Sequence, residues 1–151
     1  MKIALSFVAA ILVPASLLTA WYLYGQFAMF ESDDPYIWIR TRSFFLMCLS
    51  MATAYVVVLG IPTYLLLRKL NAIRWWSTIG AGFILGAIPE AISSWPLRYS
   101  ELQTSATVDG VQTMIDGAPT LAGWMQYTWG VAFVGACGAV GALAFWAVSR
   151  R

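Results

Sequence analysis

The stretch IALSFVAAILVPASLLTAWYLY, residues 3–24, contains no charged side chain. A helix needs about 20 apolar residues to cross the roughly 30 Å of hydrocarbon in a bilayer. Lys2 ahead of the run would also suit a secretory signal peptide, but the run is too long and lacks an Ala-x-Ala cleavage pattern. The aromatic residues at its end are typical of a membrane interface. We therefore predict a retained membrane-spanning helix over 3–24, kinked at Pro14.

Three further apolar runs predict helices over 43–67, 77–95 and 120–149. The link between the second and third helices is short, so these two helices should be antiparallel neighbours. Gly60-Ile61-Pro62 predicts a kink in the second helix. The last run is longer than a bilayer requires, and its first turns are expected to project beyond the membrane.

Residues 104–115 read TSATVDGVQTMI and predict a small β-hairpin between the third and fourth helices. Asp-Gly between two β-prone stretches is the strongest short-range hairpin signal. A second Asp-Gly, residues 116–117, should end the return strand, and Thr120 should be the N-cap of the last helix. A two-stranded hairpin is marginally stable alone. We expect it either to cap the helix ends or to bind a partner along its edge.

The composition supports one class of protein. Of 151 residues, 60% are hydrophobic and 11% are charged, whereas soluble domains carry roughly 25% charged residues. This excludes a soluble globular domain, a disordered chain and a nucleic-acid binder. We predict a single all-α membrane domain over 1–151, a bundle of four transmembrane helices with a small outer β-hairpin.

The charges also predict an orientation. Most basic residues lie at the two termini and in the link 68–76, and every acidic residue except Glu90 lies in the first and third loops. The positive-inside rule then places both termini in the cytoplasm of a bacterium and the first and third loops in the periplasm. The expected location is the inner membrane.

No catalytic or metal-binding pattern is present. The chain has no histidine, which excludes histidine-ligated haem, histidine-containing zinc sites and Ser-His or Cys-His catalysis. Cys48 and Cys137 lie in separate apolar runs and are expected to pack as small hydrophobic residues. We therefore expect neither an enzyme nor a cofactor.

Glu90 is the ionisable residue that falls within a predicted span, about 20 Å along the third helix at 1.5 Å per residue. Such a residue is a functional-site candidate by default. Its carboxylate is either a proton or cation site or the partner of an arginine near the outer boundary. The arginines concerned are Arg40, Arg42 and Arg98.

Small residues line the third and fourth helices and allow close helix packing in lipid. They would pack the helices of this chain together, or dock a second copy or a partner's helix. The glycines concerned are Gly82, Gly86, Gly135, Gly138 and Gly141.

Our hypothesis is a non-enzymatic interaction protein that binds a membrane or periplasmic protein through its outer loops. In outline the chain resembles small bacterial immunity proteins against membrane-acting toxins; an accessory subunit of a membrane complex is the other version. In size and helix count it also resembles small multidrug exporters and fluoride channels, although its glutamate lies in the third helix. The alternative is therefore a small dimeric transporter or channel with Glu90 as coupling carboxylate. The candidate partner-binding residues are Glu31, Asp33, Asp34, Asp109, Gly110, Gln112 and Asp116.

Overall fold

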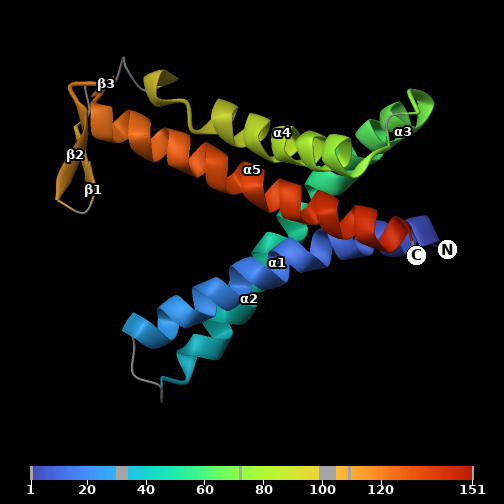
Figure 1. Ribbon diagram of the computed structural model, residues 1–151. Helices are drawn as coiled ribbons and strands as arrows, with labels where there is room; N and C mark the ends of the chain where they lie inside the picture. Colours follow the sequence, from blue (N-terminus) through green and yellow to red (C-terminus); the bar gives the residue numbers. More distant parts are fainter. Residues whose placement is uncertain (1, 30–33, 72, 99–104, 109, 151) are drawn as a thin grey trace.

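The computed structural model describes residues 2–29, 34–71, 73–98, 105–108 and 110–150, and it is mostly helical (Figure 1). The helical segments are α1 (Lys2–Met29), α2 (Tyr36–Tyr55), the π-helical segment η1 (Val56–Gly60), α3 (Ile61–Lys69), α4 (Trp75–Ser93) and α5 (Leu121–Ser149). The strands are β1 (Ala106–Val108), β2 (Val111–Ile115) and β3 (Ala118–Pro119).

The helix boundaries differ most from the prediction at the start of the second helix. It begins at Tyr36 rather than at residue 43, because Asp34 and Pro35 form a helix start ahead of the apolar run. The first helix extends five residues past residue 24, to Met29. The last helix, Leu121–Ser149, lies within the predicted range 120–149.

At the predicted kink, the second helix continues through one π turn. The backbone N–H of Ile61 donates to the carbonyl of Val56, five residues back, where an α-helix would bond four back. Pro62 follows at once and has no N–H to offer the carbonyl of Val58. The predicted irregularity at Gly60-Ile61-Pro62 is therefore a π turn in a helical path that runs from Tyr36 to Lys69.

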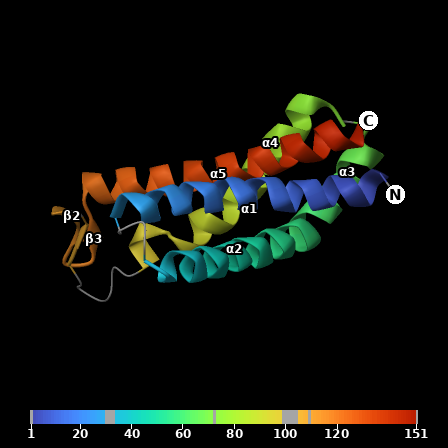
Figure 2. The same ribbon diagram turned by 90° about the horizontal axis from the view of Figure 1, so that it is seen from below.

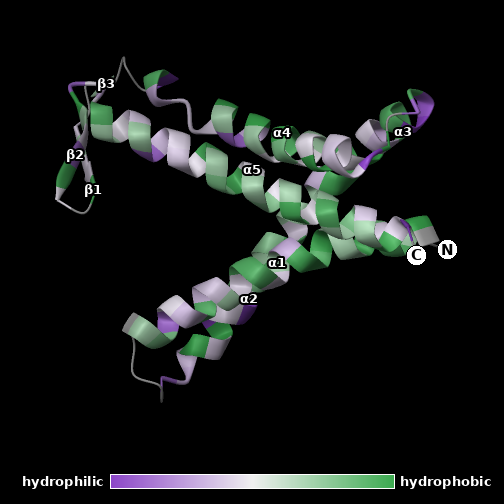
Figure 3. Ribbon diagram, viewed as in Figure 1, coloured by the Kyte–Doolittle hydropathy of each residue, from purple (hydrophilic) through white to green (hydrophobic). Residues whose placement is uncertain are grey.

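Three helical stretches in the described part of the chain are long and apolar enough to cross a membrane: Ile3–Ala28, Tyr36–Lys69 and Leu121–Ser149. α4 is not among them, because two tryptophans at its start and Pro89-Glu90 near its end lower its hydropathy. Figure 3 shows apolar residues around most of these helices and hydrophilic ones gathered near the link between α3 and α4. Four transmembrane helices were predicted; three meet these criteria.

The helices form two pairs, which we call the two arms. α1 packs with α2, α4 packs with α5, and α1 also crosses α5. α1, α2 and α5 lie roughly along one axis, with α4 oblique to them (Figure 2). The arms diverge away from the end that holds both termini (Figure 1). The result is two splayed pairs joined where α1 crosses α5, and the predicted bundle of four transmembrane helices is not confirmed.

Few side chains in the described part are buried. The buried apolar residues are Ala10, Ala15, Ile37 and Phe145, and many large apolar side chains are exposed. Exposed apolar side chains over long helices are what lipid would cover, since a bilayer solvates them as well as a protein core does.

The sheet has three antiparallel strands in the order β1-β2-β3, not the two predicted. Asp116-Gly117 ends the return strand β2, as predicted, and it also turns the chain into a third strand, β3, pairing Ile115 with Ala118. Both turn residues have positive φ, +48° at Asp116 and +80° at Gly117. This is the requirement of a two-residue type I′ turn, which Asp-Gly meets easily.

Candidate functional site

A cavity of about 350 Å³ lies between the two arms and is lined by residues of α1, α2, η1, α3, α4 and α5. We call it the central cavity. Its wall is overwhelmingly apolar, and Glu90 is the single charged side chain among the described residues that line it. The structure therefore sets the candidate carboxylate against a hollow shared by both arms.

Aromatic side chains line one region of the central cavity. Phe7 of α1, Tyr64 of α3 and Phe145 of α5 are in mutual contact, with ring centroids 4.9–5.8 Å apart. Phe145 is buried. Edge-on and tilted ring pairs of this kind pack favourably. Phe7 is near the start of α1 and Phe145 is near the end of α5, so the cluster joins three helices near the two ends of the chain.

Glu90 has no ion pair or side-chain hydrogen bond with any other described residue. Its backbone carbonyl accepts hydrogen bonds from Ser94, through the hydroxyl at 2.6 Å and the N–H at 2.9 Å. The predicted pairing with an arginine is therefore not found: Arg40 pairs elsewhere, and Arg42 and Arg98 are exposed and do not line the cavity.

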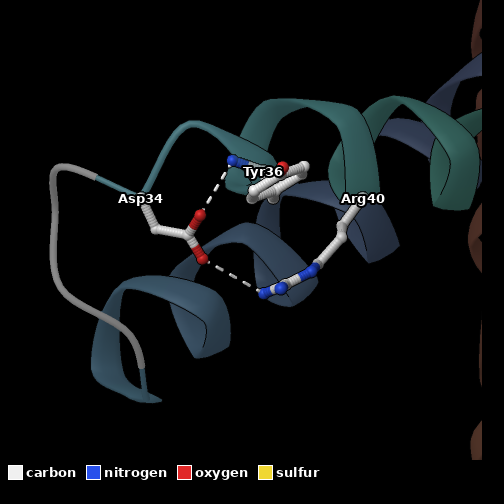
Figure 4. A network of polar contacts seen from close by, with 3 residues as sticks. All are labelled: Asp34, Tyr36 and Arg40. Carbon is white, nitrogen blue, oxygen red and sulfur yellow. Dashed lines mark hydrogen bonds and ion pairs between the residues drawn. The ribbon is translucent and has the colours of Figure 1, made fainter.

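Arg40 belongs to a small network at the start of α2 (Figure 4). The carboxylate of Asp34 accepts the backbone N–H of Tyr36 at 2.9 Å and pairs with the guanidinium of Arg40 at 3.4 Å. The backbone carbonyl of Asp34 also accepts the N–H of Ile37. Asp34, predicted as a partner-binding residue, thus has a capping role, since a carboxylate on the first free N–H groups stabilises a helix start.

Gly82 and Gly86 lie where α4 meets α5. A Cβ added at Gly86 would come 2.7 Å from the carbonyl oxygen of Val134, and one at Gly82 would come 2.6 Å from that of Gly138. Gly135 faces the ring of Phe83 in the same contact. The structure thus brings four of the five predicted packing glycines together within this chain.

The fifth glycine, Gly141, serves the crossing of α1 and α5. A Cβ there would come 2.8 Å from the carbonyl oxygen of Ala10. Pro14, one turn further on, lacks the N–H that this carbonyl would otherwise accept in the helix. Gly141 therefore packs against the carbonyl of Ala10, which accepts no helical hydrogen bond from Pro14.

The sheet is joined to α5 through Thr120. Its hydroxyl donates to the carbonyl of Gln112 at 2.7 Å and accepts the N–H of Gly123 at 3.2 Å. Its backbone N–H donates to the carbonyl of Thr113 at 3.0 Å. The predicted N-cap is confirmed, and the same residue holds β2 against the helix.

The sheet packs on the first turns of α5 and has no comparable contact with the other helices, as far as the described residues go. It stands at the tip of one arm (Figure 1). Val108, Val111 and Ile115 keep 41%, 54% and 44% of their surface exposed. The sheet is therefore not a cap over the ends of all the helices.

Some of the remaining predicted partner-binding residues lie on the exposed surface of the sheet, and the others lie outside the described residues. Gly110 and Asp116 lie in the exposed turns that join the strands, and Gln112 is exposed on β2. Glu31, Asp33 and Asp109 fall outside the described residues. Within the described part, no group of three or more carboxylates or cysteines lies together to hold a metal ion.

Sequence reasoning missed the central cavity and its aromatic cluster. Phe7, Tyr64 and Phe145 are far apart in the chain, and no local pattern links them. Cys48 and Cys137, expected to be unpaired packing residues, are free cysteines, and both line the central cavity. Comparison with protein-family models, curated proteins and solved structures found no match.

Proposed function

We propose that the chain crosses a bacterial inner membrane four times, with both termini and the α3–α4 link in the cytoplasm. Three helices meet the length and hydropathy of a span. α4 runs alongside α5 and has 19 residues, about 28 Å at 1.5 Å per residue. The basic residues at the end with the termini favour this orientation.

We further propose that the protein is a non-enzymatic interaction protein whose sheet binds a protein partner in the periplasm. One observation carries this proposal: the sheet is fixed to α5 through its middle strand β2 and leaves Val108, Val111 and Ile115 exposed. Apolar side chains on a small, water-facing sheet are a common mark of a binding surface. A preformed surface also loses less conformational freedom when it binds.

The concrete versions are an immunity-type protein that blocks a membrane-acting toxin and an accessory subunit of a membrane complex. Both require a specific partner at the sheet. Because the sheet does not cover the other helices, a partner could approach it without unfolding the arm that carries it.

The test is photo-crosslinking in native membranes with a photoreactive residue at Gln112. We expect one dominant adduct with a different protein. Val111→Asp should abolish that adduct, because a charge in an apolar interface is costly, while Leu70→Asp should not, since Leu70 is exposed at the other end. The proposal fails if only self-adducts form, or if Val111→Asp leaves the adduct unchanged.

A second candidate is a small transporter or channel, and Glu90 on the central cavity favours it. A lone carboxylate on an apolar cavity inside a membrane is a candidate coupling site. Flux of the transported solute across the membrane of proteoliposomes that contain the purified chain should then disappear in the variant Glu90→Gln. Flux that persists in that variant would exclude this candidate.

A further inference from the structure

We infer that the central cavity is a binding site for a lipophilic organic cation, with Glu90 as the counter-charge. The inference names the substrate class for the second candidate function. It concerns binding alone and does not depend on whether the sheet binds a protein.

The walls fit an apolar body. The cavity holds about 350 Å³ and is lined by aliphatic side chains, small residues and the aromatic cluster. Ligand cavities in proteins typically measure about 300–1,000 Å³, with mostly apolar walls and a few polar groups that orient the ligand. The central cavity therefore has room for one small molecule and would gain affinity from its apolar surface.

The charge of the cavity fits a cation. Glu90 is the charged side chain of the described lining, and it has no ionic or hydrogen-bonding partner among the described residues. A carboxylate beside an apolar volume is costly unless a cation or donors compensate it. No arginine or lysine of the described part lines the cavity, so a bound cation would be the counter-charge of Glu90 there.

The same wall disfavours a metal ion. Calcium takes six to eight oxygen ligands and magnesium six, and the described residues offer no cluster of carboxylates. The polar groups on the wall are hydroxyls such as those of Thr63 and Tyr64, in different parts of an otherwise apolar surface. An organic cation needs no such shell, because its charge is surrounded by its own carbon atoms.

One further feature favours a positive charge near Glu90. Pro89 lacks an N–H, so the carbonyl of Leu85 loses its usual helical donor, and Leu85 also lines the cavity. The rings of Phe7, Tyr64 and Phe145 line the part of the cavity nearer the termini and add apolar surface there.

The test uses two ions of nearly equal shape and opposite charge, tetraphenylphosphonium and tetraphenylborate. Equilibrium dialysis of the purified full chain in detergent, with excess unlabelled ion to define the saturable part, measures their affinity. We expect saturable binding of the phosphonium at one site per chain. Glu90→Gln should weaken it at least about tenfold, the loss of one partly buried charge pair, and Glu90→Asp should weaken it less. Asp34→Asn makes the same chemical change outside the cavity and should bind like the wild type.

A second pair of variants tests the cavity without touching Glu90. Ala52 lines the cavity, and Ala54, on the same helix, is exposed and does not. Ala52→Phe should lose most phosphonium binding, while Ala54→Phe should keep it. Equal affinities in the wild type and in folded Glu90→Gln would overturn the inference. So would a wild type that binds the borate as tightly, or equal binding by the two alanine variants. Saturable binding without any flux would support the site and exclude the transporter.

Discussion

At the residue scale, the contact of α4 with α5 depends on positions that carry no side chain. Gly86→Ala should lower the stability of the fold by about 1–3 kcal/mol, the usual cost of forcing extra atoms into a packed contact. Its Cβ would lie 2.7 Å from the carbonyl oxygen of Val134. A Cβ at Gly80, on the same helix, meets nothing within 4 Å, so Gly80→Ala should be neutral or slightly stabilising. Thermal unfolding followed by circular dichroism in one detergent compares them, and equal melting temperatures would contradict the packing role.

The two contacts of Asp34 can be separated by substitution. Asp34→Ala removes both and should cost about 1 kcal/mol, mostly from the lost cap. Asp34→Asn keeps an acceptor for the N–H of Tyr36 and should cost less. Arg40→Ala removes the part-buried ion pair and should cost about 1 kcal/mol or less. Hydrogen exchange of the first turn of α2 is the measurement; faster exchange in Arg40→Ala than in Asp34→Ala would refute the capping role.

The role of Asp34 at the start of α2 was present in the sequence but was not predicted. Asp34 precedes Pro35, the N-cap of α2, and an acidic residue followed by proline is typical of a helix start. Weighing that pattern would have moved the predicted helix from residue 43 towards residue 36. Glu90 was found because a charge in an apolar run stands out. That no described arginine pairs with it depends on where the arms lie, which no local pattern specifies.

At the element scale, Thr120 links the sheet to α5, and its hydroxyl carries two of the three bonds. Thr120→Val should speed hydrogen exchange in both β2 and the first turn of α5 and cost about 1–2 kcal/mol. Thr120→Ser should restore the wild-type pattern, because it keeps the hydroxyl. Thr107→Val makes the same change on exposed β1 and serves as the control. Faster exchange in α5 alone would show that the sheet is held by other contacts.

The elements were predictable to the extent that a local signal existed for each. Long apolar runs and an Asp-Gly turn correctly gave the helices and the first two strands. β3 was missed because it has two residues, one of them proline, and so lacks the alternation that marks a strand. The second Asp-Gly carried the same hairpin signal as the first and was interpreted as an end instead.

At the scale of the whole molecule, the proposed fourth crossing puts the two ends of α4 on opposite sides of the membrane. In a background of Cys48→Ala and Cys137→Ala, Gln112→Cys should react with a membrane-impermeant maleimide on intact spheroplasts. Leu70→Cys should react only after permeabilisation. Both positions are exposed, so access to the reagent decides the result. Labelling of both from the same side would show that α4 does not cross.

The splay of the two arms could not be predicted from the sequence. The helices are apolar around most of their circumference, as suits contact with lipid, and so no polar face indicates which sides pair. The glycines predicted close packing but not the partner helix. The arrangement rests on contacts such as Gly141 with Ala10 and the ring cluster, each formed between segments distant in the chain.

The π turn at Val56–Gly60 determines where this helix can lose one residue without losing its fold. A π turn holds one more residue than an α turn, so removal of one residue there would restore regular helix and keep both flanking faces aligned. Removal of one residue elsewhere in α2 would rotate everything beyond it by about 100° and turn Tyr64 away from Phe7. Deletion of Val57, which is exposed, should therefore give a folded protein, whereas deletion of Leu49 should not. Along this 34-residue helical path, the π turn is the place that tolerates a shorter chain.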